Sequence, residues 1–549
     1  MDAATIVGLA AIAVFYLLIV AGRKSGDVTA DQRAIVANRD IGLFVGVFTM
    51  AGRSAPGVHG AADSTWFGGG YINGTAQVVF DEGLVHAQAP VGYAVSLCFG
   101  GLLFAKVFRE RECVTMLDPY QEKYGPGVGS LMYLPALMGN LLYSAAVLNA
   151  LGSSVSVILD WDMHTSVIVS ACIAVGYTFF GGLYSVAYTD VVQLICVGVG
   201  LVVAVPFTWT SEHVDLGKLS LPPPANSTTT TLVGSVPSAS LASYIDSFLV
   251  LAFGGIPWQD YFQRVLSAKN VSRARWLSVL AGALCALLSV PAILIGIAAR
   301  ATDWTAFGLS AAEVHERSSS VLPLVIQKLT PLPVMFVALG AISAAVMSSC
   351  DSTILSASSM FAHNIYRTWM RPTASSTEAL WVLRARVVLV GGASCVFALT
   401  VESVYSLWFL CSDLVYVLLF PQLCCVIYAP FVNAYGVLVG FFLGLLSLKF
   451  ERRAKGGESR LGVAPFFDMG PHVPFKTVAM LINFASSPYW CPHVVRCVFL
   501  GCAGSSKVAV SPTKDFLGAF PAHEDDGQKV VGPKGIDEDD EKETADHKF

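Results

Sequence analysis

Repeated apolar segments of bilayer-spanning length constrain the fold of this chain most strongly. The first covers residues 5–22 and reads TIVGLAAIAVFYLLIVAG, and similar segments recur through most of the 549 residues. A helix needs about 20 apolar residues to cross the hydrocarbon core of a membrane. Since only 13% of the residues are charged, the composition excludes an ordinary soluble domain. We therefore predict an all-α polytopic membrane protein with about 13 transmembrane helices.

Charge and cysteine usage exclude several other classes. The net charge is −5 and no basic block resembles a nucleic-acid surface, so we expect no nucleic-acid partner. The 13 cysteines form no CxxC motif, which argues against a zinc site or a disulfide framework. We also find no nucleophile–base pair and therefore predict that the protein is not an enzyme.

The charges between the apolar segments predict the topology. Arg23 and Lys24 follow the first segment, which places that end in the cytoplasm and the N-terminus outside. Asn226 lies in the polar sequence PPPANSTTTT, and this Asn-Ser-Thr sequon predicts a glycosylated extracellular loop. The acidic C-terminal tail is expected in the cytoplasm. The basic segment KFERRAKGGESR disagrees with this alternation, so the topology after residue 430 is left open.

Two apolar segments are interrupted by glycine and proline. One contains TWFGGGYINGT (65–75) and the other contains FGGIPWQDYFQR (253–264). Broken helices at matching positions of two inverted repeats mark the binding site of many transporters. A glycine that merely allows close helix packing is the alternative interpretation. Because each lies at the start of a five-helix unit, the pair predicts a binding site at the middle of the membrane.

We expect the chain to divide into six regions. They are an N-terminal transmembrane helix (1–22), a first five-helix repeat (41–209), an extracellular loop (210–239), a second five-helix repeat (240–428), the last two transmembrane helices (429–501) and a cytoplasmic acidic tail (502–549).

The ninth segment carries a row of hydroxyl groups in the sequence SAAVMSSCDSTILSASS (343–359). Ser348, Ser352 and Ser356 recur at helical spacing, with Ser349 beside them. Such hydroxyls often bond back to a carbonyl of their own helix. A row of them beside Asp351 instead suggests hard oxygen ligands for a monovalent cation. We predict a sodium site formed by Ser348, Ser349 and carbonyl groups of an unwound neighbouring helix.

Ionisable and aromatic side chains inside the apolar segments are further candidates. A charged residue at this depth is costly and is a functional hypothesis by default. The acidic candidates are Asp190, Asp246, Asp260, Asp351 and Asp413. Aromatic faces bind quaternary ammonium groups, which cannot donate an N–H hydrogen bond. The aromatic candidates, near glycine or proline breaks, are Trp66, Tyr71, Tyr93, Tyr143, Trp258 and Trp408.

With these motifs in view, the sequence resembles the high-affinity choline transporters of the sodium/solute symporter family. The resemblance covers roughly residues 5–450 and is strongest in TWFGGGYINGT, YTFFGGLYSVAYTDVVQL, GGIPWQDYFQRVLS and AVMSSCDSTILSASSMFAHNIY. It implies a LeuT-like core of two inverted five-helix repeats and choline uptake driven by sodium, with chloride dependence. It also implies a plasma-membrane protein, presynaptic and vesicular in cholinergic neurons, that supplies acetylcholine synthesis.

The resemblance also implies roles for individual residues. The choline cage would contain Trp66, Tyr93, Tyr143, Trp258 and Trp408, where Tyr143 stands at a position that is commonly Trp. The sodium ligands would be the carbonyl of Ala345, the hydroxyls of Ser348 and Ser349, and backbone carbonyls near Trp66. Independently of the resemblance, we expect Asp246, Asp260 and Asp351 to support the site, because they are ionisable residues inside apolar segments. Two departures are His86, where relatives have Trp, and Asp260, which replaces a small residue.

The largest departure is the segment AGRSAPGVHGAADS (51–64), which adds about a dozen residues at the first break, so that irregular backbone would lie at membrane depth. It is a gene-model artefact, a real insertion that abolishes transport, or a real insertion accommodated in a vestibule. Two alternative functions follow: a transport-inactive choline-binding sensor, or a symporter for another organic cation. Whether the chain forms a homo-oligomer is left open.

Overall fold

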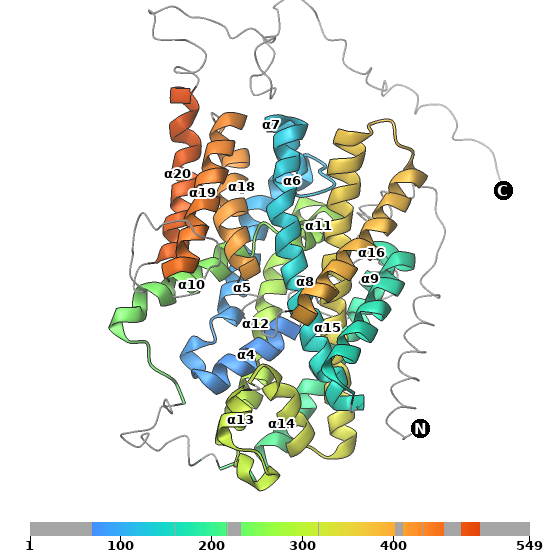
Figure 1. The fold of residues 1–549 in the computed structure, drawn as a ribbon, viewed down its shortest axis with the longest axis vertical. Coiled ribbons are helices and arrows are strands. Elements are labelled where there is room, and N and C mark those ends of the chain that lie inside the picture. The colour runs from blue at the N-terminus through green and yellow to red at the C-terminus, as the bar shows by residue number, and fades with distance from the viewer. Residues whose placement is uncertain are drawn as a thin grey trace, which may run out of the picture.

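The computed structural model describes most of the predicted membrane-embedded core. The described residues are 69–159, 161–215, 217, 232–268, 270–316, 318–400, 410–430, 432–454 and 474–494. They form a bundle of long helices that run between two ends of the molecule (Figure 1). One end carries α6 (Ala105–Glu110) and α7 (Asp118–Leu131), and the opposite end carries α13 (Ala311–Glu316) and α14 (Val321–Leu329).

The described residues are almost entirely helical, and the one β-bridge among them joins Val214 to Thr302. The helices of the first half of the chain are α4 (Gly69–Asp81), η2 (Leu84–His86), α5 (Ala89–Phe99), η3 (Gly100–Phe104), α6, α7, α8 (Tyr133–Leu159) and α9 (Met163–Trp209). Those of the second half are η5 (Ser238–Ser240), α10 (Leu241–Gly254), α11 (Gln259–Ser267), α12 (Val271–Ala301), η6 (Trp304–Phe307), α13, η7 (Ser318–Ser320), α14, α15 (Leu332–Met360), η8 (Phe361–Met370), α16 (Ser376–Thr400), η9 (Val415–Leu419), α18 (Phe420–Tyr428), α19 (Ala434–Ala454) and α20 (Phe475–Val494).

Within the described residues, eight helical segments are long and apolar enough to cross a membrane. They are Leu84–Glu110, Tyr133–Ser156, Met163–Phe180, Ser238–Ser267, Val271–Ala301, Leu332–Met370, Ser376–Thr400 and Leu410–Tyr428. Large apolar side chains such as Leu287, Val396 and Phe180 are 64%, 61% and 63% exposed, as expected where lipid replaces water. The predicted all-α membrane fold is confirmed, whereas the count of about 13 helices stays a prediction.

One predicted boundary differs from the structure. We expected separate helices at 164–182 and 187–209, but residues Met163–Trp209 are helical without interruption as α9. Gly181 and Gly182 lie at the expected end of the first helix, where glycine is a common helix-end signal, but the backbone of α9 continues through both.

Close helix crossings hold the bundle together around α15. This helix packs along α9 and α8, while α12 packs against α4 and α5, and α19 pairs with α20. At the α9–α15 crossing, a Cβ atom on Gly200 would lie 2.5 Å from Cβ of Ala341. Small residues at such a crossing let two membrane helices approach each other closely.

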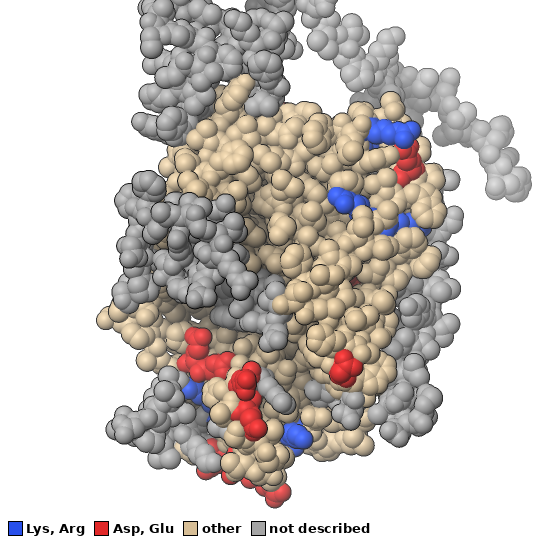
Figure 2. Space-filling view, in the orientation of Figure 1, with Lys and Arg blue, Asp and Glu red and all other residues tan. Residues whose placement is uncertain are grey.

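Charged side chains on the face drawn in Figure 2 lie mostly toward the two ends of the bundle. There, most of the described Lys, Arg, Asp and Glu residues gather near the start of α16, at the end that carries α7, and near α13, at the opposite end. The surface between them is largely uncharged. This distribution fits a bundle whose middle faces hydrocarbon and whose ends face water.

The helix break predicted from FGGIPW is present in the structure. The helix α10 ends at Gly254 and α11 begins at Gln259, with Trp258 in an extended conformation (φ −114°, ψ 133°) just before it. At the other predicted break, the structure shows only the following helix, α4, because the residues before Gly69 lie outside the described part of the chain.

Candidate functional site

Four aromatic side chains from separate helices meet beside the break between α10 and α11. Tyr71 of α4 and Tyr93 of α5 lie with ring centroids 6.0 Å apart. Tyr143 of α8 and Trp258 lie 5.7 Å apart, edge to face. The charge environment of Tyr93 includes the hydroxyl of Tyr143, so the two pairs lie near each other, and we call the four side chains the aromatic cluster. All four are at most 5% exposed.

The break itself fixes Trp258 in this aromatic cluster. The indole Nε1 donates a hydrogen bond of 2.8 Å to the carbonyl of Gly254, at the last turn of α10. This bond satisfies the polar atom of the ring and leaves its faces for apolar or cationic contact. Gly139 of α8 borders the indole: a Cβ atom there would lie 3.6 Å from its Cη2 atom, an ordinary contact, and 3.0 Å from a methyl group of Val415.

Tyr143 joins the aromatic cluster to the row of hydroxyls on α15. Its side chain interacts with the hydroxyl of Ser349 and, through its charge environment, with Asp260. Tyr71 donates a hydrogen bond of 2.9 Å to the carbonyl of Cys285 on α12. The predicted cage residues that the structure describes, Tyr93, Tyr143 and Trp258, are therefore brought together next to α15.

The predicted sodium ligands lie on the buried face of α15. Ala345, Ser348 and Ser349 are at most 1% exposed. The Ser349 hydroxyl lies 3.3 Å from the carbonyl of Ala345, four residues earlier, so it can bond back to its own helix. The atoms that would bind the cation are hydroxyl and carbonyl oxygens, which suit a hard monovalent cation that must bind and then be released. Among the described residues no cluster of three His, Cys, Asp or Glu side chains competes as a site for another metal.

Some hydroxyls of the row bond to carbonyls of α15 itself, and others bond to side chains of α11. Thr353 and Ser358 bond back to carbonyls of α15, as membrane helices commonly allow. Ser352 instead accepts a hydrogen bond of 2.6 Å from Arg264 of α11. Ser356 donates one of 3.0 Å to the Oε1 atom of Gln263. These contacts join the second half of the broken helix to the helix that carries the predicted sodium ligands.

Arg264 is a residue that the sequence reasoning missed. Its side chain is fully buried, and Nη1 lies 4.0 Å from Oδ1 of Asp260, which is 2% exposed. The same nitrogen donates to the Asp260 carbonyl at 2.9 Å. The spacing of Asp260 and Arg264, four residues apart directly after a helix break, is the sequence signal that would have revealed this ion pair.

Two further acidic candidates, Asp351 and Asp246, have different surroundings. Asp351 is buried on α15, and its Oδ1 accepts a bond of 2.6 Å from the amide of Ser352. Asp246 of α10 lies at the start of α20, where its carboxylate accepts bonds from the amides of Lys476 and Thr477 at 3.0 and 2.7 Å. Through these contacts Asp246 caps α20, the last helix that the structure describes.

The remaining candidates have other partners or lie outside the described residues. His86 packs edge-on against Tyr244, with ring centroids 5.8 Å apart, and its Nδ1 lies 3.2 Å from Glu82. Asp413 forms an ion pair of 2.6 Å with Lys476. The predicted residues Trp66, Trp408 and Asn226, the segment 51–64 and the side chain of Asp190 lie outside what the structure describes.

Comparisons with known proteins identify the family of this chain. The profile of the sodium:solute symporter family matches residues 48–444. High affinity choline transporter 1 of Homo sapiens is 47% identical over 505 residues, which are 87% of this chain and 84% of the human protein. High-affinity choline transporter 1 of Drosophila melanogaster is 46% identical over 88% of this chain and 77% of the fly protein.

Solved structures share the fold. The chain is similar to a substrate-bound, outward-open Na⁺-coupled sialic acid symporter with a TM-score of 0.71 at 15% identity, covering 90% of this chain and 98% of that one. The nucleobase–cation symporter MHP1 aligns with a TM-score of 0.52 at 11% identity, covering 84% and 94%. These likenesses establish the LeuT-type helical fold. From its sequence match and its fold together, this chain belongs to the sodium:solute symporter family.

Proposed function

We propose that this protein is a sodium-coupled choline symporter that works by alternating access. The observation that carries the proposal is the aromatic cluster at the α10–α11 break, which touches the hydroxyl-bearing face of α15 through Tyr143 and Ser349. Aromatic faces suit a quaternary ammonium group, and hydroxyl oxygens suit sodium. The names of the relatives, which describe choline transporters, support the same substrate.

The buried ion pair favours choline over a protonated amine as substrate. A primary ammonium group would use a carboxylate acceptor for its N–H groups, whereas choline carries no N–H. The carboxylate nearest to Trp258 in sequence is that of Asp260, and Arg264 already lies 4.0 Å from it. The guanidinium offsets that charge, so the tyrosine and tryptophan rings supply the main attraction for a cation.

Finer parts of the proposal follow from the family resemblance. We include chloride dependence, residence in the plasma membrane, and a supply of choline for acetylcholine synthesis. We also include Trp66 and Trp408 in the cage, and backbone carbonyls near Trp66 among the sodium ligands. The end that carries α6 and α7 would face the cytoplasm, because the basic loops of the sequence lie there.

Labelled choline uptake tests the proposal directly. Cells expressing the full chain are compared in sodium and in sodium-free buffer, beside a version that lacks residues 52–63. We expect sodium-dependent uptake, and uptake by both versions would mean that the additional segment is tolerated. Uptake only by the shorter version would mean that the segment blocks an otherwise intact site. Binding without accumulation would favour the sensor, and stronger competition by another amine would favour a different cation.

Two sets of variants test the site within the same assay. Trp258→Ala is expected to raise the choline KM roughly several-fold to thirtyfold, since a cation–π contact contributes about 0.5–2 kcal/mol. The matched control is Trp276→Ala on α12, whose ring is 58% exposed on the outside of the bundle. Replacing both Ser348 and Ser349 by Ala should remove the sodium dependence. Unchanged sodium activation in that double variant would contradict the sodium assignment.

A further inference from the structure

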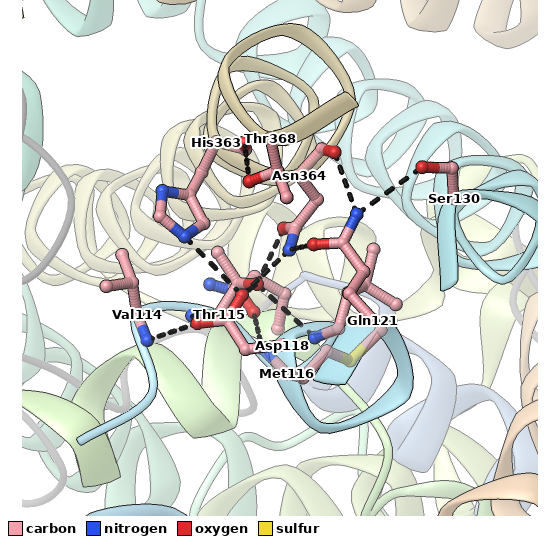
Figure 3. A network of polar contacts seen from close by, with 11 residues as sticks. Val114, Thr115, Met116, Asp118, Gln121, Ser130, His363, Asn364 and Thr368 are labelled. Atoms are coloured by element: carbon pink, nitrogen blue, oxygen red, sulfur yellow. Dashed lines mark hydrogen bonds and ion pairs between the residues drawn. The ribbon is translucent and has the colours of Figure 1, made fainter. Parts of the chain in front are cut away.

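A polar cluster joins the α6–α7 connection to the end of the hydroxyl-bearing helix (Figure 3). Its members are Thr115, Asp118, Gln121, His363 and Asn364, and we call it the Asp118 cluster. The first three come from the start of α7 and the turn before it, and the last two come from η8. Because η8 continues α15 without a gap, the cluster ties α7 to the helix with the predicted sodium ligands.

Asp118 is the centre of this cluster. Its Oδ2 accepts hydrogen bonds from the amides of Val114 and Thr115 at 2.6 and 3.1 Å. Its Oδ1 accepts from Nδ2 of Asn364 at 2.8 Å, and Nε2 of His363 lies 3.5 Å away. Gln121 completes the link, because its amide bonds both the side chain and the carbonyl of Asn364 at 2.8 Å.

The carboxylate of Asp118 is held in its ionised form. Burial alone would raise the pKa of Asp118, but hydrogen bonds and charge from His363 and the amide of Val114 lower it to about 2. A depressed folded-state pKa stabilises the folded protein above the unfolded value of 3.8 and loses that effect as the pH falls toward 2. Between pH 5 and 8, as a rough range, Asp118 therefore accepts its hydrogen bonds without change.

The same turn also reaches the broken helix. The amide of Met116 donates a buried hydrogen bond of 2.8 Å to Oε1 of Gln259. Gln259 is the first residue of α11 and directly follows Trp258. At the other end of α11, Nε of Arg109 donates to the carbonyl of Ala268 at 2.7 Å. The α6–α7 region thus holds both ends of α11.

We propose that Asp118 is a positioning residue for transport. Asp118 fixes the turn that binds Gln259 and connects that turn to η8. As a result, Trp258 keeps a fixed position relative to the hydroxyl-bearing face of α15. A shift of α11 relative to α15 must then change the Met116–Gln259 bond or the bonds of the Asp118 cluster. The identity of the substrate in this inference rests on the proposed function.

The first test replaces Asp118 by Asn, which cannot accept the two amide bonds at its NH₂ group. We expect the choline KM to rise roughly tenfold at matched surface abundance, because charge-assisted bonds are lost. The matched control is Asp162→Asn. Asp162 accepts a comparable bond of 2.9 Å from the amide of Thr165 at the start of α9, and Asn caps a helix equally well there.

A second variant separates positioning from simple loss of folding. Gln259→Met removes only the acceptor for Met116, and we expect it to raise the choline KM in the same direction. In the double variant, the rise in KM should be much smaller than the product of the two single rises, because both substitutions act through one hydrogen-bonded chain. KM values that multiply independently, or a change in abundance with an unaltered KM, would overturn the proposal.

Thiol labelling tests the position of the turn without using choline. Cys113 is 6% exposed, and burial, with added effects of Asp118 and Glu122, raises its pKa to about 12. Such a thiol reacts slowly with a maleimide. We expect faster labelling in Asp118→Asn and also in Gln259→Met, where the carboxylate is unchanged, with Cys113→Ser as background. If the unmodified protein accumulates no choline, the proposed function fails, while unchanged labelling in both variants would separately overturn the positioning role.

Discussion

The two halves of the broken helix differ in what surrounds them. The first half, α10, is largely apolar, and its Leu241 and Ile245 are 49% and 48% exposed on the outside of the bundle. The second half, α11, is buried at all nine positions, although Asp260, Gln263 and Arg264 are among them. A polar helix is buried at tolerable cost only when its groups have partners. The apolar half, α10, thus holds the break at the lipid-facing side of the bundle, and the polar half, α11, connects the break to α15.

The largest effect is expected from the buried cation of α11. Arg264→Met leaves Asp260 in the protein interior without the guanidinium that lies 4.0 Å away. Removing one partner of a buried pair costs about 3–5 kcal/mol, so we expect a large fall in the thermal midpoint of the detergent-solubilised protein.

The control for this change lies in the other half of the helix. Ile245→Leu on α10 should alter the free energy of unfolding by no more than about 0.5 kcal/mol. Adding Asp260→Val to Arg264→Met should recover much of the loss, because no unpaired charge is left. Equal effects of the α10 and α11 changes would remove the distinction between the two halves.

A medium effect is expected at the break itself. A Cβ atom at Gly254 would lie 2.9 Å from Cβ of Tyr416 and 3.3 Å from the carbonyl of Ser412. We expect Gly254→Ala to lower the free energy of unfolding by about 1–3 kcal/mol, as overpacking does.

Gly74 of α4 provides the comparison, because nothing lies within 4 Å of a Cβ atom built there. Gly74→Ala should leave stability unchanged or raise it by about 0.5–1 kcal/mol, through the helix propensity of alanine. Thermal midpoints of the two variants check this difference. A tolerated Gly254→Ala would mean that the break does not pack as closely as described.

The smallest effect is expected in the apolar half, α10. Asp246→Ala removes the cap of α20 and should cost about 0.5–2 kcal/mol of stability. Because Asp246 contacts Lys476 and Thr477 rather than the aromatic cluster, we expect the choline KM to stay unchanged. A rise in KM with normal stability would instead support the predicted role of Asp246 in supporting the binding site.

The sequence predicted the parts of this arrangement that depend on local patterns. The break at Gly254–Pro257 follows from glycine and proline inside an apolar segment, and the row of hydroxyls on α15 follows from helical spacing. The uninterrupted α9 was missed because two apolar segments in succession, with Gly181 and Gly182 between them, predict two helices, whereas the helix continues through both glycines.

Partners distant in the chain could not be predicted in this way. Asp246 finds its partners 230 and 231 residues later, and Gln259 finds Met116 143 residues earlier. An aspartate in an apolar segment signals that a partner is needed, but not which helix provides it. The sequence therefore predicted a supporting role for Asp246 near the site, and the contacts that the structure shows for its carboxylate are with α20.

The cap on α20 also has a consequence for how the protein is made. The carboxylate of Asp246 and that of Asp413 both bind residues at the start of the last described helix, through the amide of Thr477 and the ammonium group of Lys476. During synthesis these acidic groups enter the membrane long before their partners are translated. Until α20 arrives, the earlier helices carry carboxylates that hydrocarbon does not tolerate well. A chain truncated before α20 would thus keep these carboxylates without their partners, and we expect the cell's quality control to recognise and degrade it.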